Sequence, residues 1–403
     1  MRGYFKYLAV GVSYYLIILL ISLAYFLINN SDSLSDNVFL YFDAVHYYNV
    51  AIEGYLSHYE VAFFPLFPFA WNFLGLSLIG ISCLNAVIYI SCIAFLGKAE
   101  NMNWADYLIA LALPSAVFYF IPYSEAFYFI SCGLLLYGIR ENKFHLEILG
   151  IILCCFCRPV LPVIFPAVLL FSLYEKSTMY KAVIRSATAL AGTLSAFFIH
   201  WIYTGNFFSY FSAFNTWDYN FRFPLLPLKS GGGNMITHID GYALLFGIIS
   251  ILLVIIFLKN NNKKNEIKSY EFFSLVYLSF FTLLILGLLR GGSLTSLNRF
   301  IFCSPFFIVS LFYIEKNFIK IKSTRNILLL LMSLVLFGLL FQSYVHIQVF
   351  IKYLIVAILF SFYLAKKHSV LRIINVEKTI LLLMLIALQL VCVNKFLNGQ
   401  WVG

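Results

Sequence analysis

Apolar runs of about 20 residues recur along the whole chain, which is the length that a helix needs to cross the ~30 Å hydrocarbon core of a bilayer. Short polar segments separate them. The pattern predicts an all-α polytopic integral membrane protein with about 11–13 transmembrane helices. The crossings are expected at 7–29, 77–97, 104–121, 124–139, 145–157, 160–174, 183–204, 241–258, 271–289, 300–315, 325–343, 350–365 and 377–395. Without linker or repeat, one domain over 1–403 is the simplest interpretation.

The distribution of Lys and Arg orients these helices. If the N-terminus lies in the cytoplasm, 20 of the 27 Lys and Arg residues fall in cytoplasmic segments, as the positive-inside rule requires. The first run is too long for a signal-peptide core, and no small-residue cleavage site follows it, so we expect a retained helix. The two long connections, 30–76 and 205–240, then lie on the outer face, where function is expected.

Composition narrows the class of protein further. The chain is 62% hydrophobic and 11% charged, which is too little polar surface for a soluble globule of 403 residues. The net charge of +10 is spread over short loops, and this excludes a nucleic-acid surface. Cys154, Cys155 and Cys157 have no His or acid beside them in a loop and are interpreted as buried free cysteines instead of metal ligands. We predict no metal and no cofactor.

The first outer connection is expected to carry a short interfacial helix over 41–55. Ser35 or Asp36 is the candidate residue for capping its start, and Gly54 fits a left-handed end. Farther on, Pro65 and Pro68 are expected to prevent a regular helix and to set an angled entry into the membrane.

Asp43 and His46 are three residues apart, so they share one face of that helix. Two interpretations remain open from the residues alone. The pair is either a solvated part of an amphipathic surface helix or a pair of groups that act in catalysis.

The run Phe42-Asp43-Ala44-x-His46, followed by Gly54-Tyr55 and Ala62-Phe63-Phe64-Pro65-Leu66-Phe67-Pro68, resembles the signature of the PIG-V family. That family contains the mannosyltransferase that adds the second mannose of the GPI-anchor glycan, and many prokaryotic relatives. Its pattern has Trp where this chain has Phe42. Its eukaryotic form has an acid shortly after Gly-Tyr, where this chain has His58 and then Glu60.

Further matches follow along the chain. They are Pro122-Tyr123-Ser124-Glu125 at the opening of a helix, Cys157-Arg158-Pro159 with Pro159 at the first position of the next helix, Gly205 with Trp217, and Asn298-Arg299-Phe300. The resemblance covers most of 40–305, whereas 300–403 is matched only by hydropathy. It implies a GT-C-type glycosyltransferase fold.

The resemblance also implies roles for eight residues, all of which the Lys and Arg count places on the outer face. Asp43 is expected to be the general base of an inverting transfer, and His46 to orient the acceptor or contact phosphate. The expected substrate-binding residues are Glu60, Glu125, Arg158, Trp217, Arg222 and Arg299. Glu125 is expected either to bind sugar hydroxyls or to set one of the arginines in place. Arg158 and Arg299 are the favoured phosphate ligands because guanidinium forks match phosphate oxygens. The alternatives are snorkelling charges for the arginines and an interface aromatic for Trp217.

The expected function is transfer of a sugar, by resemblance mannose, from a polyprenyl- or dolichyl-phosphate donor to a glycolipid or glycan acceptor at the non-cytoplasmic face. The expected partners are thus the bilayer, that donor and that acceptor. The main alternative is a transporter or lipid flippase, which would place ionisable groups near mid-membrane and show repeated halves. The others are a GT-C enzyme with a different sugar and an inactive relative. A composition rich in Lys, Asn, Ile and Phe favours a bacterial plasma membrane over an ER membrane.

Overall fold

The computed structural model describes residues 2–29, 36–216, 221–231, 233–259, 267–317, 323–341, 351 and 371–403. Helices dominate these residues, and they contain no strand beyond two isolated bridges, Leu228 with Phe341 and Lys229 with Ser293. Within these described ranges, six helices are long and apolar enough to cross a membrane. The prediction of an all-α polytopic membrane protein is confirmed at this level.

The long helices follow the apolar runs of the sequence. They are α1 (Arg2–Asn29), α4 (Leu78–Ala99), α6 (Glu125–Arg140), α7 (Phe144–Cys157), α8 (Leu161–Glu175), α9 (Met179–Thr204), α11 (Gly233–Lys259), α12 (Ser269–Phe280) with its π-helical continuation η5 (Phe281–Leu289), α14 (Pro305–Asn317), α15 (Ser323–Leu340) and α17 (Leu371–Leu397). Almost all of the predicted crossing at 350–365 lies outside the described residues.

The predicted crossing at 104–121 is not one continuous helix. It divides into α5 (Trp104–Leu111) and a 3-10 helix, η3 (Pro114–Tyr119). Pro114 explains the break, because proline has no N–H to donate and disfavours the helical conformation at the residue before it. Leu113 accordingly has ψ 133°. A second division separates α13 (Leu297–Phe302) from α14.

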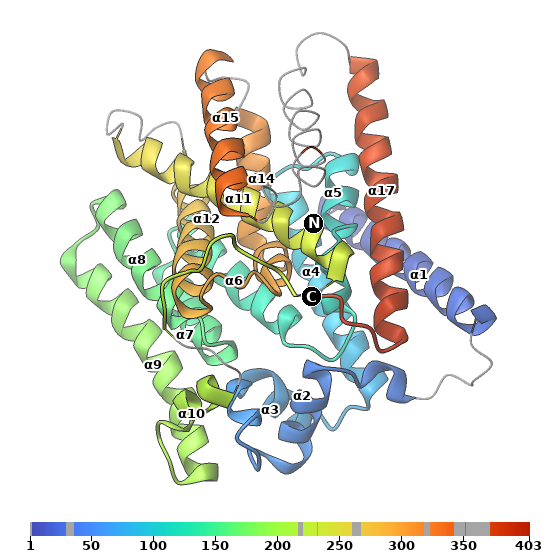
Figure 1. Cartoon of the computed structure of the whole chain (residues 1–403), viewed down its shortest axis with the longest axis vertical. Coiled ribbons are helices and arrows are strands. Elements are labelled where there is room, and N and C mark those ends of the chain that lie inside the picture. The colour runs from blue at the N-terminus through green and yellow to red at the C-terminus, as the bar shows by residue number, and fades with distance from the viewer. Residues whose placement is uncertain are drawn as a thin grey trace.

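The helix α6 lies in the centre of the molecule and packs against α4, α7 and α12 (Figure 1). Two glycines permit the close approach of α6 and α7. A Cβ atom on Gly138 would lie 2.3 Å from the backbone nitrogen of Glu147, and one on Gly150 would lie 2.4 Å from that of Leu135. Any larger side chain at either crossing point would force the two helices apart.

Short helices of the first outer connection gather at one end of the molecule, the lower end in Figure 1. They are α2 (Asp43–Glu53), a 3-10 turn η2 (Glu60–Ala62) and α3 (Leu66–Leu74), with α10 (Ser209–Thr216) beside them. The predicted helix within 41–55 is confirmed as α2. Its predicted cap at Asp36 is wrong, because Asp36 belongs to a separate turn, η1 (Asp36–Phe39), and α2 begins only at Asp43. Ser35, the other candidate, lies outside the described residues.

Two further expectations for this connection have different outcomes. Gly54 ends α2 with a positive φ of 77°, but its ψ of −158° lies outside the left-handed helical region that was predicted. A Cβ atom there would lie 2.3 Å from Cε1 of Tyr203. The expectation that Pro65 and Pro68 prevent a regular helix is wrong. Pro65 directly precedes α3, and Pro68 lies in its first turn, where the missing N–H has no acceptor within the helix.

The cysteines are unpaired. Cys154, Cys155 and Cys157 are buried on α7, which confirms their interpretation as buried free cysteines.

Candidate functional site

The backbone of Phe42 places Asp43 at the first position of α2. Phe42 has φ 54° and ψ −124°, a conformation that sterics disfavour for any residue with a Cβ atom. Such a residue costs about 1–3 kcal/mol and persists only where its surroundings hold it. The ring of Phe42 lies 5.0 Å from that of Trp401 and 6.5 Å from that of Phe396, centroid to centroid. Aromatic contacts with the C-terminal segment therefore hold the turn that presents Asp43.

Arg299 joins the carboxylates of Asp43 and Glu125. Its Nη1 donates to Oδ2 of Asp43 at 2.5 Å, and its Nε donates to Oε1 of Glu125. Nη2 of Arg158 donates to the same Oε1 atom at 2.7 Å. The four side chains thus form one series, Asp43–Arg299–Glu125–Arg158, which we call the ion-pair chain. Four of the eight predicted site residues meet in it.

The ion-pair chain is buried except at one end. Glu125 is fully buried, and the side chains of Arg299 and Arg158 are 4% and 8% exposed, whereas that of Asp43 is 23% exposed. Charges at such depth persist only when they are paired. Oε2 of Glu125 is buried and accepts no hydrogen bond from a described residue. A buried acceptor of this kind calls for an explanation, and a ligand hydroxyl or a water molecule would satisfy it.

Aromatic rings surround the two guanidinium groups. Cζ of Arg299 lies 4.7 Å from the ring centroid of Tyr123 and 5.1 Å from that of Phe118. Cζ of Arg158 lies 5.1 Å from the ring centroid of Phe300. Ring faces attract cations and exclude water, so they strengthen every electrostatic interaction in this space.

Burial by itself lowers the pKa of the Arg158 and Arg299 guanidinium groups. The neighbouring carboxylates outweigh this effect: Glu125 raises the pKa of both, and Asp43 adds to it at Arg299. Both pKa values lie above the usual arginine value, so both groups are cationic. The ion-pair chain therefore holds two fixed positive charges behind an accessible carboxylate.

The opening of α6 is as predicted. Tyr123-Ser124-Glu125 turns directly into the helix, which begins at Glu125. The hydroxyl groups of Tyr47, on α2, and Ser124 form a hydrogen bond of 2.6 Å, and burial raises the pKa of the Tyr47 phenol. The neutral phenol of Tyr47 thus connects α2 to the start of α6. This connection fixes the position of Asp43 relative to Glu125.

Arg158 follows the last residue of α7 in an extended conformation, with φ −149° and ψ 154°. The prediction that Pro159 is the first residue of the next helix is wrong. The helix α8 begins at Leu161, and Pro162 occupies its first turn instead. Arg158 therefore lies in a short extended link, which points its side chain toward Glu125.

Asp240, on α11, supports the segment that carries Arg299. It is fully buried, and its Oδ1 accepts hydrogen bonds from the backbone N–H and from Nδ2 of Asn298, at 2.9 and 2.8 Å. Its Oδ2 accepts from the hydroxyl of Ser230, and Ser115 donates to Oδ1 of Asn298. Sequence reasoning missed Asp240. The sequence signal for Asp240 was that it is a single carboxylate at the edge of an apolar run, where an ionisable residue indicates a functional or supporting role.

Replacing Asp240 by Ala is expected to lower the free energy of unfolding by about 1–3 kcal/mol, because the buried donors on Asn298 lose their acceptor. Asp240→Asn keeps one acceptor oxygen and should lose less. The measurement is the thermal unfolding midpoint of the detergent-solubilised protein, with Glu53→Ala at an exposed carboxylate as the control. An unchanged midpoint in Asp240→Ala would show that these hydrogen bonds do not hold α13.

His46 lies one turn beyond Asp43 on α2. Its ring stacks on that of Phe63, with centroids 4.9 Å apart and an interplanar angle of 18°. The structure therefore places it against the second element of the motif, Ala62–Pro68. Its role toward the acceptor or phosphate stays a prediction.

Glu60 is buried and bonded within its own loop. Its Oε2 accepts from the backbone N–H groups of Leu56 and Ser57, at 3.2 and 2.9 Å, and its Oε1 accepts from Nδ2 of Asn49 at 3.3 Å. Both oxygens thus shape the turn after α2. The predicted contact with substrate gains no support from this geometry.

Neither of the other two predicted residues, Arg222 and Trp217, belongs to the ion-pair chain within the described part of the structure. The exposed Arg222 lies against the turn after η5, where its backbone N–H donates to the carbonyl of Leu288 and its side chain packs on Gly291. Trp217 lies outside the described residues.

The C-terminal segment forms one wall of the site, which sequence reasoning also missed. Gly399 packs on the ring of Tyr41, Trp401 on Phe42, and Gly403 on Phe118, which also contacts Arg299. Hydropathy carried no signal for these contacts. The family resemblance matches 300–403 only by hydropathy, so it implies no site residues in this segment.

Among the described residues, no group of three or more His, Cys, Asp or Glu side chains is arranged to hold a metal ion. No family model matches the chain, and neither does any curated protein or solved structure in the comparisons. The resemblance to the PIG-V family therefore stays a prediction that rests on its motifs. The ion-pair chain is the strongest structural indication of a functional site.

Proposed function

We propose that this protein is an inverting glycosyltransferase that moves a sugar from a polyprenyl-phosphate donor to a glycolipid or glycan acceptor. The observation that carries the proposal is the ion-pair chain. In it the partly accessible carboxylate of Asp43 pairs with the buried guanidinium of Arg299, and the guanidinium of Arg158 shares Glu125 with Arg299. Transfer from a lipid phosphate needs both a base and cations, and here they occur within one connected set. Mannose is the proposed sugar on the strength of the motif resemblance alone.

The phosphate group would bind at the arginines. Arg299 now bridges Asp43 and Glu125, and Arg158 shares Glu125 with it. A donor phosphate would replace Asp43 as the partner of Nη1 in Arg299, while Glu125 keeps both guanidinium groups in place. Arginine forks bind phosphate oxygens with good geometry and keep their charge, so they stabilise the phosphate as it leaves.

The same exchange would release Asp43 to act as a general base. Asp43 takes the proton of the acceptor hydroxyl as its oxygen attacks the anomeric carbon from the face opposite the phosphate. The new C–O bond forms while the bond from that carbon to the phosphate oxygen breaks, and the electron pair leaves with the polyprenyl phosphate. The configuration at the anomeric carbon is inverted. No acid is required, because the leaving group is already a stable anion.

The direct test uses purified wild-type protein in detergent with membrane lipid extract as acceptor. Labelled polyprenyl-phosphate mannose, polyprenyl-phosphate glucose and GDP-mannose are supplied in separate reactions. We expect label from the mannose lipid to appear in a new glycolipid, and none from the nucleotide sugar. Transfer from GDP-mannose alone would contradict the proposed donor class. No transfer from any lipid donor would favour a transporter, a flippase or an inactive relative.

A further inference from the structure

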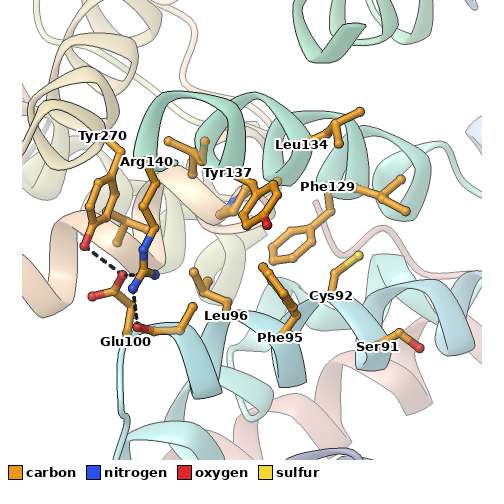
Figure 2. A pocket seen from close by; sticks show the side chains of 16 residues that line it. Ser91, Cys92, Phe95, Leu96, Glu100, Phe129, Leu134, Tyr137, Arg140 and Tyr270 are labelled. Carbon is orange, nitrogen blue, oxygen red and sulfur yellow. Dashed lines mark hydrogen bonds and ion pairs between the residues drawn. The ribbon is translucent and has the colours of Figure 1, made fainter. Parts of the chain in front are cut away.

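A cavity of ≈ 300 Å³ lies between α4 and α6, and residues of α12 and α14 also line it (Figure 2). Its walls are almost entirely apolar. Cys92, Phe95 and Leu96 line it from α4, and Phe129, Ile130 and Leu134 line it from α6. Phe95 and Ile130 are also 46% and 44% exposed on the outside of the bundle. In a membrane-spanning bundle, such residues face lipid, so the cavity lies next to the bilayer.

One end of the cavity is polar, as Figure 2 shows for Glu100, Arg140 and Tyr270. Oε1 of Glu100 accepts from Nη1 of Arg140 at 3.0 Å and from the hydroxyl of Tyr270 at 2.8 Å. Nζ of Lys316 donates to Oε2 of Glu100 at 3.4 Å. The buried carboxylate is therefore fully satisfied by its neighbours and needs no further cation.

Arg140 has N–H groups that make no hydrogen bond to another described residue. Its Nη1 donates one hydrogen bond to Glu100 and its Nη2 donates one to the carbonyl of Ala99, and its Nε lies 3.6 Å from Oε1 of Glu141. A guanidinium has five N–H groups, so each Nη keeps a second one with no acceptor among the described residues. The side chain is 27% exposed, which leaves these donors within reach of a ligand.

Lys143 adds a second available cation at the same end. It is exposed, and its Nζ donates to the hydroxyl of Tyr137, which lines the cavity, at 3.2 Å. Around this mouth the cations Arg140, Lys143, Lys268 and Lys316 face three carboxylates, Glu100, Glu141 and Glu271. The mouth of the cavity is thus net positive.

The polar mouth of the cavity is distant from the candidate active site, although the apolar part reaches Phe129, one turn into α6. Glu125 is the first residue of α6 and Arg140 is the last, so the two polar groups lie about 22 Å apart along the helix axis. The Lys and Arg distribution predicts that the Arg140 end faces the cytoplasm. A donor lipid held at the ion-pair chain would therefore belong to the opposite leaflet.

We propose that this cavity binds an anionic phospholipid of the inner leaflet, with one acyl chain between α4 and α6 and the phosphate group at Arg140 and Lys143. The apolar walls match the chain, and the net positive mouth matches the headgroup. Basic pockets between transmembrane helices at the cytoplasmic side hold anionic lipids by the same combination. This inference goes beyond the proposed sugar transfer and does not depend on it.

The test is native mass spectrometry of the detergent-solubilised full chain, titrated with phosphatidylglycerol and, separately, with phosphatidylcholine of identical acyl chains. Wild type is expected to bind phosphatidylglycerol about fivefold more tightly or better. Gly133→Leu fills the cavity from α6, where a Cβ atom meets nothing within 4 Å, and should weaken that binding about tenfold. Lys143→Gln, which leaves the Glu100 contacts intact, should reduce the preference for phosphatidylglycerol.

The matched control is Gly3→Leu, at another helical glycine where a Cβ atom meets nothing within 4 Å. It is expected to bind both lipids as wild type does. Equal affinity of wild type for the two lipids would overturn the proposal. So would a Gly133→Leu protein that binds phosphatidylglycerol as tightly as Gly3→Leu.

Discussion

Asp43→Asn is expected to slow sugar transfer about a thousandfold, which is the middle of the range for loss of a general base. Asn has nearly the same shape but cannot accept the proton of the acceptor hydroxyl at neutral pH. The loss should fall on kcat, because the arginines that bind the phosphate remain. The measurement is the initial rate of mannose transfer from polyprenyl-phosphate mannose at saturating donor.

The control for this prediction is Asp43→Glu, which restores a carboxylate one methylene farther along the side chain. It should recover part of the rate that Asn loses. The thermal unfolding midpoint must be compared in both variants, because each changes the ion pair with Arg299. A well-folded Asp43→Asn protein with wild-type kcat would show that Asp43 is not the base.

Arg299→Gln is expected to lower the free energy of unfolding by about 3–5 kcal/mol, because it removes one partner from buried ion pairs. Glu125 would keep only Arg158, and Asp43 would lose its partner in the ion-pair chain. The unfolding midpoint in detergent measures this effect. Lys98→Gln, at an exposed cation, is the control and should change stability by no more than about 0.5 kcal/mol.

A double-mutant cycle separates this pairing from a general loss of packing. Glu125→Gln together with Arg299→Gln removes both charges of one pair, so the double variant should be less destabilised than the sum of the two single variants. Coupling of about 0.5–3 kcal/mol is typical of side chains in one network. Strict additivity of the single effects would contradict the ion pair between Arg299 and Glu125.

Hydropathy predicted most of the fold because each long helix is an apolar run. Apart from the misplaced cap of α2 and the conformation of Gly54, the errors occurred where a proline decided the local geometry. Pro114 divides the run at 104–121, whereas Pro68 fits into the first turn of α3 without breaking it. The two outcomes differ because a proline early in a helix gives up no hydrogen bond, while one in the middle does.

Motif reasoning predicted all four members of the ion-pair chain and a contact of Glu125 with an arginine, but not the contact between Asp43 and Arg299. Asp43 and Arg299 are 256 residues apart in sequence, and nothing local to either residue indicates the other. The contact follows from the packing of α2, α6 and α13, which no short pattern encodes. Glu60 matched the family only loosely, and the structure bonds it within its own turn.

Supporting residues were the hardest to predict. Asp240 acts through Asn298, and Trp401 acts through the backbone conformation of Phe42. Neither belongs to a motif, and their contribution depends on contacts between distant segments. A lone carboxylate beside an apolar run was the single available signal for Asp240, and Trp401 offered none.

The central claim is that the ion-pair chain is a site for a lipid phosphate. The most direct measurement compares binding of polyprenyl phosphate and of polyprenol of the same length to wild type and to Arg158→Gln in detergent. Wild type should bind the phosphate more tightly than the alcohol, and Arg158→Gln should lose about tenfold or more of that preference. Equal binding of the two lipids by wild type would contradict the claim and leave the ion-pair chain a purely structural network.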